Sequence, residues 1–82
     1  MKESFECYIL NNRLFVFDTS SHFIVYFENG NWHEECNIKE SLVTGSTKIT
    51  QEEALKIACG NDPTEYIEKL DYEDMLKNIY CP

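Results

Sequence analysis

The sequence predicts an α+β fold in which a four-stranded antiparallel β-meander is followed by two or three short helices packed on one sheet face. The first half of the chain alternates apolar and polar residues around short Asn-rich turns, a pattern typical of antiparallel strands. The second half carries a helix-capping signal and apolar residues three and four positions apart. Because the strands precede the helices, α+β is favoured over a parallel α/β sheet. The 82 residues are expected to form a single domain, 1-82.

The four predicted strands cover residues 4-10, 13-18, 22-28 and 32-36. Asn11-Asn12 and Asn29-Gly30 suit two-residue turns, since Asn and Gly tolerate positive φ. Such turns set Leu10 opposite Arg13 and Phe27 opposite Trp32. The register between the second and third strands stays open, because the length of the loop between them is not defined by a turn signal.

The three predicted helices cover residues 50-59, 63-70 and 72-80, and the last two could form one bent helix. Thr50 and Glu53 make a capping box at the start of the first, and Gly60 is expected as its C-cap. Asp62-Pro63 supplies an N-cap and a first helical residue for the second. Residues 37-48 show no clear period and are expected to form a crossing loop that includes at most a short extended piece at 41-44.

The turn-defined register sorts the strand residues onto two faces. The face expected against the helices carries Phe5, Cys7, Ile9, Leu14, Val16, Phe23, Val25, Phe27, Trp32 and Cys36. The opposite face carries Tyr8, Phe15, Phe17, Ile24 and Tyr26, together with Leu10 and His33. A sheet face in water should be polar. Either the 37-48 loop and the C-terminal helix cover this second face, or its aromatic residues form a partner-binding surface.

The net charge of −8 is divided evenly between the two halves of the chain. This charge disfavours direct nucleic-acid binding and favours a basic protein partner. The predicted acidic partner-binding residues are Glu52, Glu53, Glu65, Glu68, Asp71, Glu73 and Asp74. Helical carboxylates three positions apart lie roughly 5–6 Å apart, close to the spacing of phosphates along a nucleic-acid strand. The alternative is an ordinary solvated face with acids at helix N-termini.

No motif in the sequence indicates catalysis, a metal site or a cofactor, and we expect none of the three. Asp18, Ser20, Ser21 and His22 are catalytic-triad residue types, but neighbouring positions in a tight turn cannot adopt triad geometry. His33 and Cys36 resemble a metal-ligand pair, yet they point to opposite faces of a regular strand.

The expected location is the cytoplasm. The apolar runs are too short to span a bilayer, and charged residues interrupt the first ten positions, where a signal peptide would be apolar. The four cysteines are accordingly expected to be reduced thiols.

In size, charge and composition the chain resembles the small acidic proteins with which phages and bacteria occlude a partner, including anti-CRISPR and toxin-immunity proteins. The resemblance covers no motif, so no functional residue is carried over from it. It implies a non-enzymatic, protein-binding inhibitor that occludes a basic site on a nucleic-acid-handling host enzyme, in the host-cell cytoplasm if phage-encoded. The alternative is a self-associating structural or adaptor module that forms a homodimer through the aromatic sheet face.

Overall fold

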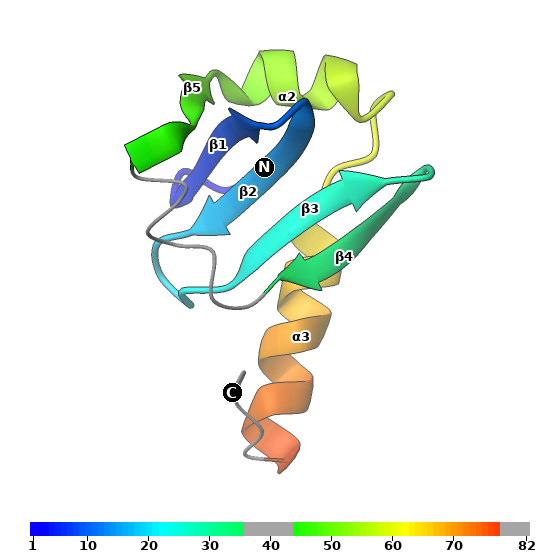
Figure 1. The fold of residues 1–82 in the computed structure, drawn as a ribbon. Coiled ribbons are helices and arrows are strands. Elements are labelled where there is room, and N and C mark those ends of the chain that lie inside the picture. The colour runs from blue at the N-terminus through cyan, green and yellow to red at the C-terminus, as the bar shows by residue number, and fades with distance from the viewer. Residues whose placement is uncertain (36–43, 78–82) are drawn as a thin grey trace.

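The computed structural model describes residues 1–35 and 44–77, with side chains up to residue 73. One five-stranded sheet and two helices lie within these residues (Figure 1). The elements are β1 (Phe5–Leu10), β2 (Arg13–Asp18), β3 (Ile24–Glu28), β4 (Asn31–Glu35), β5 (Thr47–Ile49), α2 (Gln51–Ile57) and α3 (Thr64–Lys77). The strand order is β4-β3-β2-β1-β5, and every pairing is antiparallel. The predicted α+β class with an antiparallel sheet is confirmed.

The predicted four-stranded meander was incomplete, because β5 begins inside the residues assigned to a crossing loop, 37-48, and ends one residue beyond them. Ile49 pairs with Cys7, and Thr47 pairs with Ile9, so β5 extends the sheet beyond β1. A three-residue strand is too short to show a period-two pattern, and its partner is distant in sequence. Of the extended piece expected at 41-44, only Thr44 is described, and it belongs to a helical turn.

The predicted helices at 63-70 and 72-80 are one helix, α3. Neither Gly nor Pro occurs between Thr64 and Lys77, so nothing in the sequence breaks the backbone hydrogen bonds at Asp71. Residues 78–80 lie outside the described residues. The N-terminal half of α3 packs behind the sheet through Ile67, whereas its C-terminal half extends beyond the strands (Figure 1).

Both ends of α2 are capped by local hydrogen bonds. The predicted capping box is confirmed, with the Glu53 amide donating to Thr50 Oγ1 at 3.1 Å. At the other end the Gly60 amide donates to the Leu55 carbonyl at 2.8 Å, and the Cys59 amide donates to the Lys56 carbonyl at 3.2 Å. This pair of bonds is a Schellman motif. In this motif one position adopts a left-handed conformation and is usually Gly. Here that position is Cys59, with a φ of 55°, and not Gly60 as the sequence suggested.

The two registers predicted from the turns are confirmed. The register between β2 and β3, which the sequence left open, is now defined. Leu10 lies opposite Arg13 and Phe27 opposite Trp32. Between β2 and β3, Val16 lies opposite Val25. The third strand begins at residue 24 and not at 22, since residue 22 has a φ of 66°, which interrupts a strand.

Asp18, at the end of β2, accounts for this register. Its buried side chain accepts hydrogen bonds from the hydroxyls of Ser4, Ser20 and Ser21 at 2.7–2.9 Å and from the Ser20 amide at 3.0 Å. Its backbone amide donates to the Phe23 carbonyl at 2.9 Å. Burial alone would raise the pKa of Asp18, but the hydrogen bonds from the serines outweigh it and lower the pKa below its usual value.

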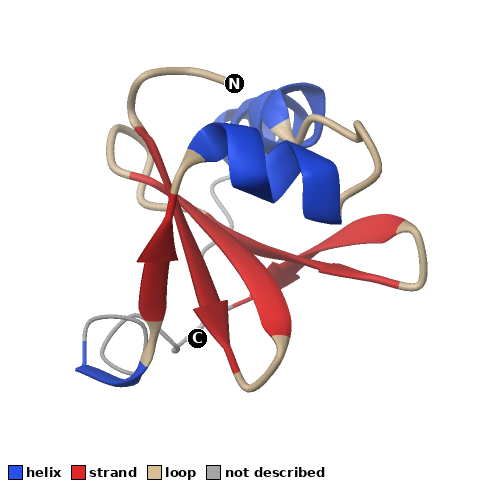
Figure 2. Ribbon diagram, turned by 90° about the horizontal axis from the view of Figure 1, so that it is seen from above, coloured by secondary structure: helices blue, strands red, loops and turns tan. Residues whose placement is uncertain are grey.

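The two sheet faces form two separate apolar clusters, as the predicted sorting of side chains requires. Both helices lie on the same side of the sheet (Figure 2). The larger cluster joins that face to the helices through Ala54, Ala58 and Ile67, and its fully buried centre is Val16 and Val25. The smaller cluster, on the opposite face, consists of Phe15 and Ile24 with Tyr8, Leu10, Phe17 and Tyr26 packed around them.

Replacing Cys59 by Gly should stabilise the protein. The left-handed conformation is unfavourable for a residue with a Cβ, so Cys59→Gly should raise the free energy of unfolding by about 0.5–1 kcal/mol. Thermal unfolding should show this as an increase in Tm of a few degrees. The control Cys59→Ala removes the thiol but keeps the strain, so an equal gain in that variant would contradict the explanation.

Replacing Asp18 by Asn should destabilise the protein in a pH-dependent way. Asp18→Asn should lower the free energy of unfolding by about 2 kcal/mol at pH 7, because charge-assisted hydrogen bonds are lost. The folded-state pKa of Asp18 is lowered, so the stabilisation is present above the unfolded value of about 3.9 and is lost as the pH falls through the folded value. Urea unfolding of both proteins should show the gap narrowing below about pH 4. The control Asp71→Asn, at an exposed position, should match the wild type at every pH.

Candidate functional site

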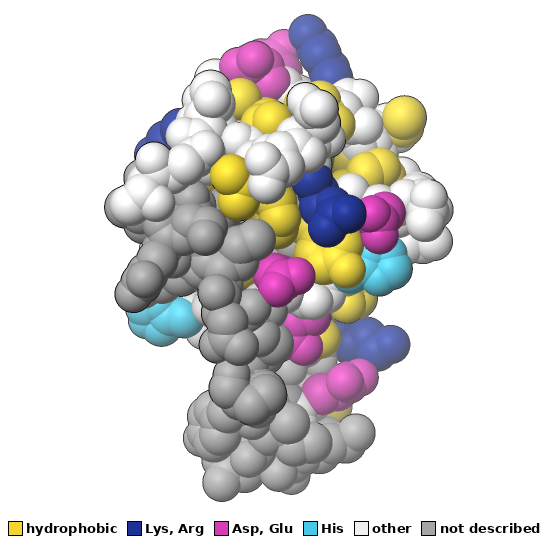
Figure 3. All heavy atoms as spheres, in the orientation of Figure 1, with side chains coloured by type: hydrophobic (Ala, Val, Ile, Leu, Met, Phe, Trp, Pro, Cys, Tyr) yellow, Lys and Arg dark blue, Asp and Glu magenta, His cyan; other side chains and the backbone are white. Residues whose placement is uncertain are grey.

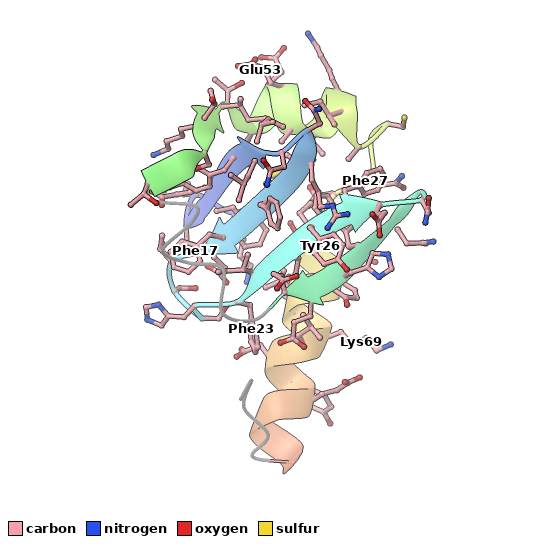
Figure 4. The ribbon with its side chains drawn as sticks, in the orientation of Figure 1. Phe17, Phe23, Tyr26, Phe27, Glu53 and Lys69 are labelled. Carbon is pink, nitrogen blue, oxygen red and sulfur yellow. The ribbon has the colours of Figure 1, made fainter. Side chains whose placement is uncertain are left out.

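The structure distributes the predicted acidic residues over two separate regions. Glu53 takes part in the capping box of α2, and Glu52 is exposed on the same helix. On α3, Glu65, Glu68 and Asp71 are exposed and Glu73 is partly buried, while the side chain of Asp74 lies outside the described part. Figure 4 labels Glu53 on α2 at one end of the molecule and Lys69 on α3 towards the other. The two helices therefore do not present one continuous acidic surface.

The centre of the predicted aromatic surface is buried. Phe15 is 3 % exposed and Ile24 is 5 % exposed, so neither offers a partner much surface in this conformation. Tyr8, Phe17 and Tyr26 are partly buried. Figure 3 views this face, with apolar side chains grouped over the sheet and charged and histidine side chains beside them. One of the two alternatives was that the 37-48 loop covers this face, and most of that loop lies outside the described residues.

Tyr26 shows how the remaining aromatic surface is occupied by neighbouring side chains. The guanidinium of Arg13 lies 4.8 Å from the centre of the Tyr26 ring, and the His33 ring stacks on Tyr26 at a centroid distance of 5.2 Å. Arg13 also forms an ion pair with Glu28. This side of the sheet is thus partly covered by its own polar side chains.

A groove of about 870 Å³ brings together three segments that are distant in sequence. They are the β3–β4 turn with the start of β4, the loop between α2 and α3, and the first two turns of α3. The groove is lined by Gly30, Asn31, Trp32, Gly60, Asn61, Asp62, Thr64, Glu65, Tyr66 and Glu68. Its volume is within the range of small-ligand binding sites. We regard this groove as the candidate functional site.

One hydrogen bond and packing against the larger apolar cluster hold the aromatic side chains of the groove in place. The indole Nε1 of Trp32 donates to the Asn61 carbonyl at 3.0 Å, which ties β4 to the α2–α3 loop. The ring of Tyr66 packs against the larger apolar cluster, which holds it against the sheet. Burial and neighbouring carboxylates raise the pKa of Tyr66, so the phenol stays protonated at neutral pH. Both rings are therefore fixed before any partner arrives.

The groove is strongly acidic. Asp62, Glu65 and Glu68 line it, and none of its described lining residues is Lys or Arg. Asp62 caps α3 by accepting from the Thr64 amide at 2.8 Å, and it forms an ion pair with the Met1 ammonium at 2.9 Å. Burial alone would raise the pKa of Asp62, but its bonds to Thr64 and the Met1 ammonium lower it. Asp62 is therefore ionised at neutral pH.

The sequence indicated some residues of this groove but not the groove itself. Glu65 and Glu68 were predicted partner-binding residues, and both line the groove. Trp32 was assigned to the helix-covered face. It does pack against the larger cluster, but it also lines the groove. The indole N–H was the sequence signal for a further contact of Trp32, because a partly buried tryptophan usually has a hydrogen-bond partner.

The remaining residues with catalytic or metal-binding side chains make contacts that stabilise the fold. The hydroxyls of Ser20 and Ser21 donate to Asp18, and the His22 ring contacts Phe17. Burial raises the pKa of the Cys7 thiol to about 11. Within the described residues no group of three or more His, Cys, Asp or Glu side chains is placed to hold a metal ion. Cys36 lies outside the described residues. None of the described helices is long and apolar enough to cross a membrane.

Replacing Trp32 by Phe should loosen the groove. Trp32→Phe removes the indole N–H and leaves the Asn61 carbonyl without that donor, which should cost about 1–2 kcal/mol of unfolding free energy. Urea unfolding followed by circular dichroism measures the loss. Tyr72→Phe, at a position that is 62 % exposed, is the control and should change stability by less than about 0.5 kcal/mol. An unchanged stability in Trp32→Phe would contradict the structural role of this bond.

Comparisons of the chain with protein-family models, curated proteins and solved structures find no match.

Proposed function

We propose that this protein is a small non-enzymatic inhibitor that binds a basic site on a partner protein through the acidic groove and the adjoining face of α3. The observation that carries the proposal is the concentration of three carboxylates on one groove without a basic residue among its described lining. A net charge of −8 on 82 residues adds a long-range field of the same sign. Such a field accelerates encounters with a basic surface and repels acidic ones.

The arrangement of acids along α3 supports a partner that handles nucleic acid. Glu65 and Glu68 are exposed and three positions apart, and Asp71 continues the series at the same interval. Side chains at this spacing lie on one side of a helix, roughly 5–6 Å apart. A basic channel that accepts a phosphate backbone would accept this row of charges. We therefore propose a nucleic-acid-mimicking inhibitor of the anti-defence or immunity type that acts in the cytoplasm.

The alternative, self-association through the aromatic sheet face, has less support from the burial of that face. Phe15 and Ile24 are almost inaccessible, and Tyr26 is flanked by Arg13 and His33. A homodimer interface of ordinary size needs about 800 Å² of accessible surface on each copy. Sedimentation at micromolar concentration distinguishes a dimer from a monomer.

Capture of basic proteins by the immobilised protein should depend on salt and on the groove. From a bacterial lysate at about 0.05 M salt it should retain basic, nucleic-acid-handling proteins and release them near 1 M, where the Debye length is only about 3 Å. The double variant Glu65→Gln, Glu68→Gln should weaken binding of the captured protein at least about fivefold.

The matched control for this experiment carries the same loss of charge outside the groove. Glu3→Gln combined with Glu35→Gln removes two carboxylates that do not line the groove. This control should bind within about twofold of the wild type, because only long-range attraction is reduced. Failure to retain any nucleic-acid-handling protein at either salt concentration would reject the proposed function.

A further inference from the structure

The groove holds fixed aromatic rings beside carboxylates, and we propose that its occupant is an arginine side chain of a basic protein partner. This inference rests on the proposed function and names the chemical group that the groove recognises. A guanidinium can stack on an aromatic face while it donates paired hydrogen bonds to a carboxylate. Trp32 and Tyr66 supply the aromatic surface, and Glu65 supplies the carboxylate.

Charge complementarity is already visible in the contacts that the chain makes with this groove. The Met1 ammonium lies on Asp62, and the Lys2 ammonium lies 3.9 Å from Glu68 Oε1. Glu65 has no ion-pair or hydrogen-bond partner among the described residues, and it is exposed. The Lys2–Glu68 pair is long and its side chains are about half exposed, so an incoming cation can displace it at little cost. The groove thus accepts cations and retains one carboxylate for a partner.

The N-terminus of α3 also faces this region, and its partial positive charge of about half a unit opposes a cation. The effect is small here, because Asp62 caps that end of the helix and Glu65 lies in its first turn. Asp62 and Glu68 are paired with ammonium groups, but the full negative charge of Glu65 still exceeds the partial charge of one helix end.

Arginine is favoured over lysine by the shape of the site. Trp32 is held by its hydrogen bond to the Asn61 carbonyl and Tyr66 by packing against the larger apolar cluster, so a planar group can stack with little entropic cost for ordering the two rings. Lysine carries a compact, strongly hydrated charge and stacks less well. A groove that bound by charge alone would not distinguish the two.

The chain reports on this groove directly, because Trp32 is its only tryptophan. Titration of the wild type with a hexa-arginine peptide at low salt should change Trp32 fluorescence along a saturable curve. Hexa-lysine should bind at least about threefold more weakly. Glu65→Gln should weaken hexa-arginine binding at least about threefold, whereas Glu3→Gln, which removes the same charge outside the groove, should stay close to the wild type.

Three results would overturn the inference: equal weakening by Glu65→Gln and Glu3→Gln, equal affinity for the two peptides, or calorimetric binding of hexa-arginine without a Trp32 response. All three can occur while the protein still captures basic nucleic-acid-handling proteins, in which case the proposed function stands and the groove is not its arginine site. Loss of that capture, with groove binding intact, would instead reject the proposed function.

Discussion

The buried carboxylate of Asp18 fixes the register between β2 and β3, and the separation of the sheet into two faces depends on that register. Side chains alternate along a strand, so a slip of one residue would bring Ile24 or Tyr26 under the helices in place of Val25. The serine hydroxyls that surround Asp18 come from the turn itself and from the segment before β1. One polar cluster therefore aligns the N-terminal segment, β2 and β3, and thereby sets what the helices cover.

The sequence predicted the turns and the start of α2, which depend on local residue chemistry, although it misplaced the left-handed position after α2 by one residue. The two-residue turns at Asn11-Asn12 and Asn29-Gly30 defined two registers correctly, and the Thr50 capping box defined the start of α2. The sorting of residues onto two faces followed from these turns. The strand β5 was missed because its pairing with β1 is a long-range contact, and a segment of three residues is too short to show a strand pattern.

The candidate site was predictable only in part for a related reason. Its acidic residues lie close together on one helix, so composition and spacing identified Glu65 and Glu68. The groove itself arises where a hairpin turn, an interhelical loop and a helix meet, and no sequence pattern places Gly30 beside Asn61. The burial of Phe15 and Ile24 was equally hidden, because alternation tells which face a residue occupies but not how much of that face reaches solvent.

The pairing of β5 with β1 also bears on the order in which the molecule assembles. The β1–β2 and β3–β4 hairpins close short loops, and such hairpins form within about 1–10 μs. β5 must instead find β1 after the chain has passed through the other strands, which costs additional loop-closure entropy. Since α2 begins only two residues after β5 ends, docking of β5 also brings Ala54 onto the sheet. We therefore expect the edge of the sheet and the helical layer to be completed in the same late, rate-limiting step.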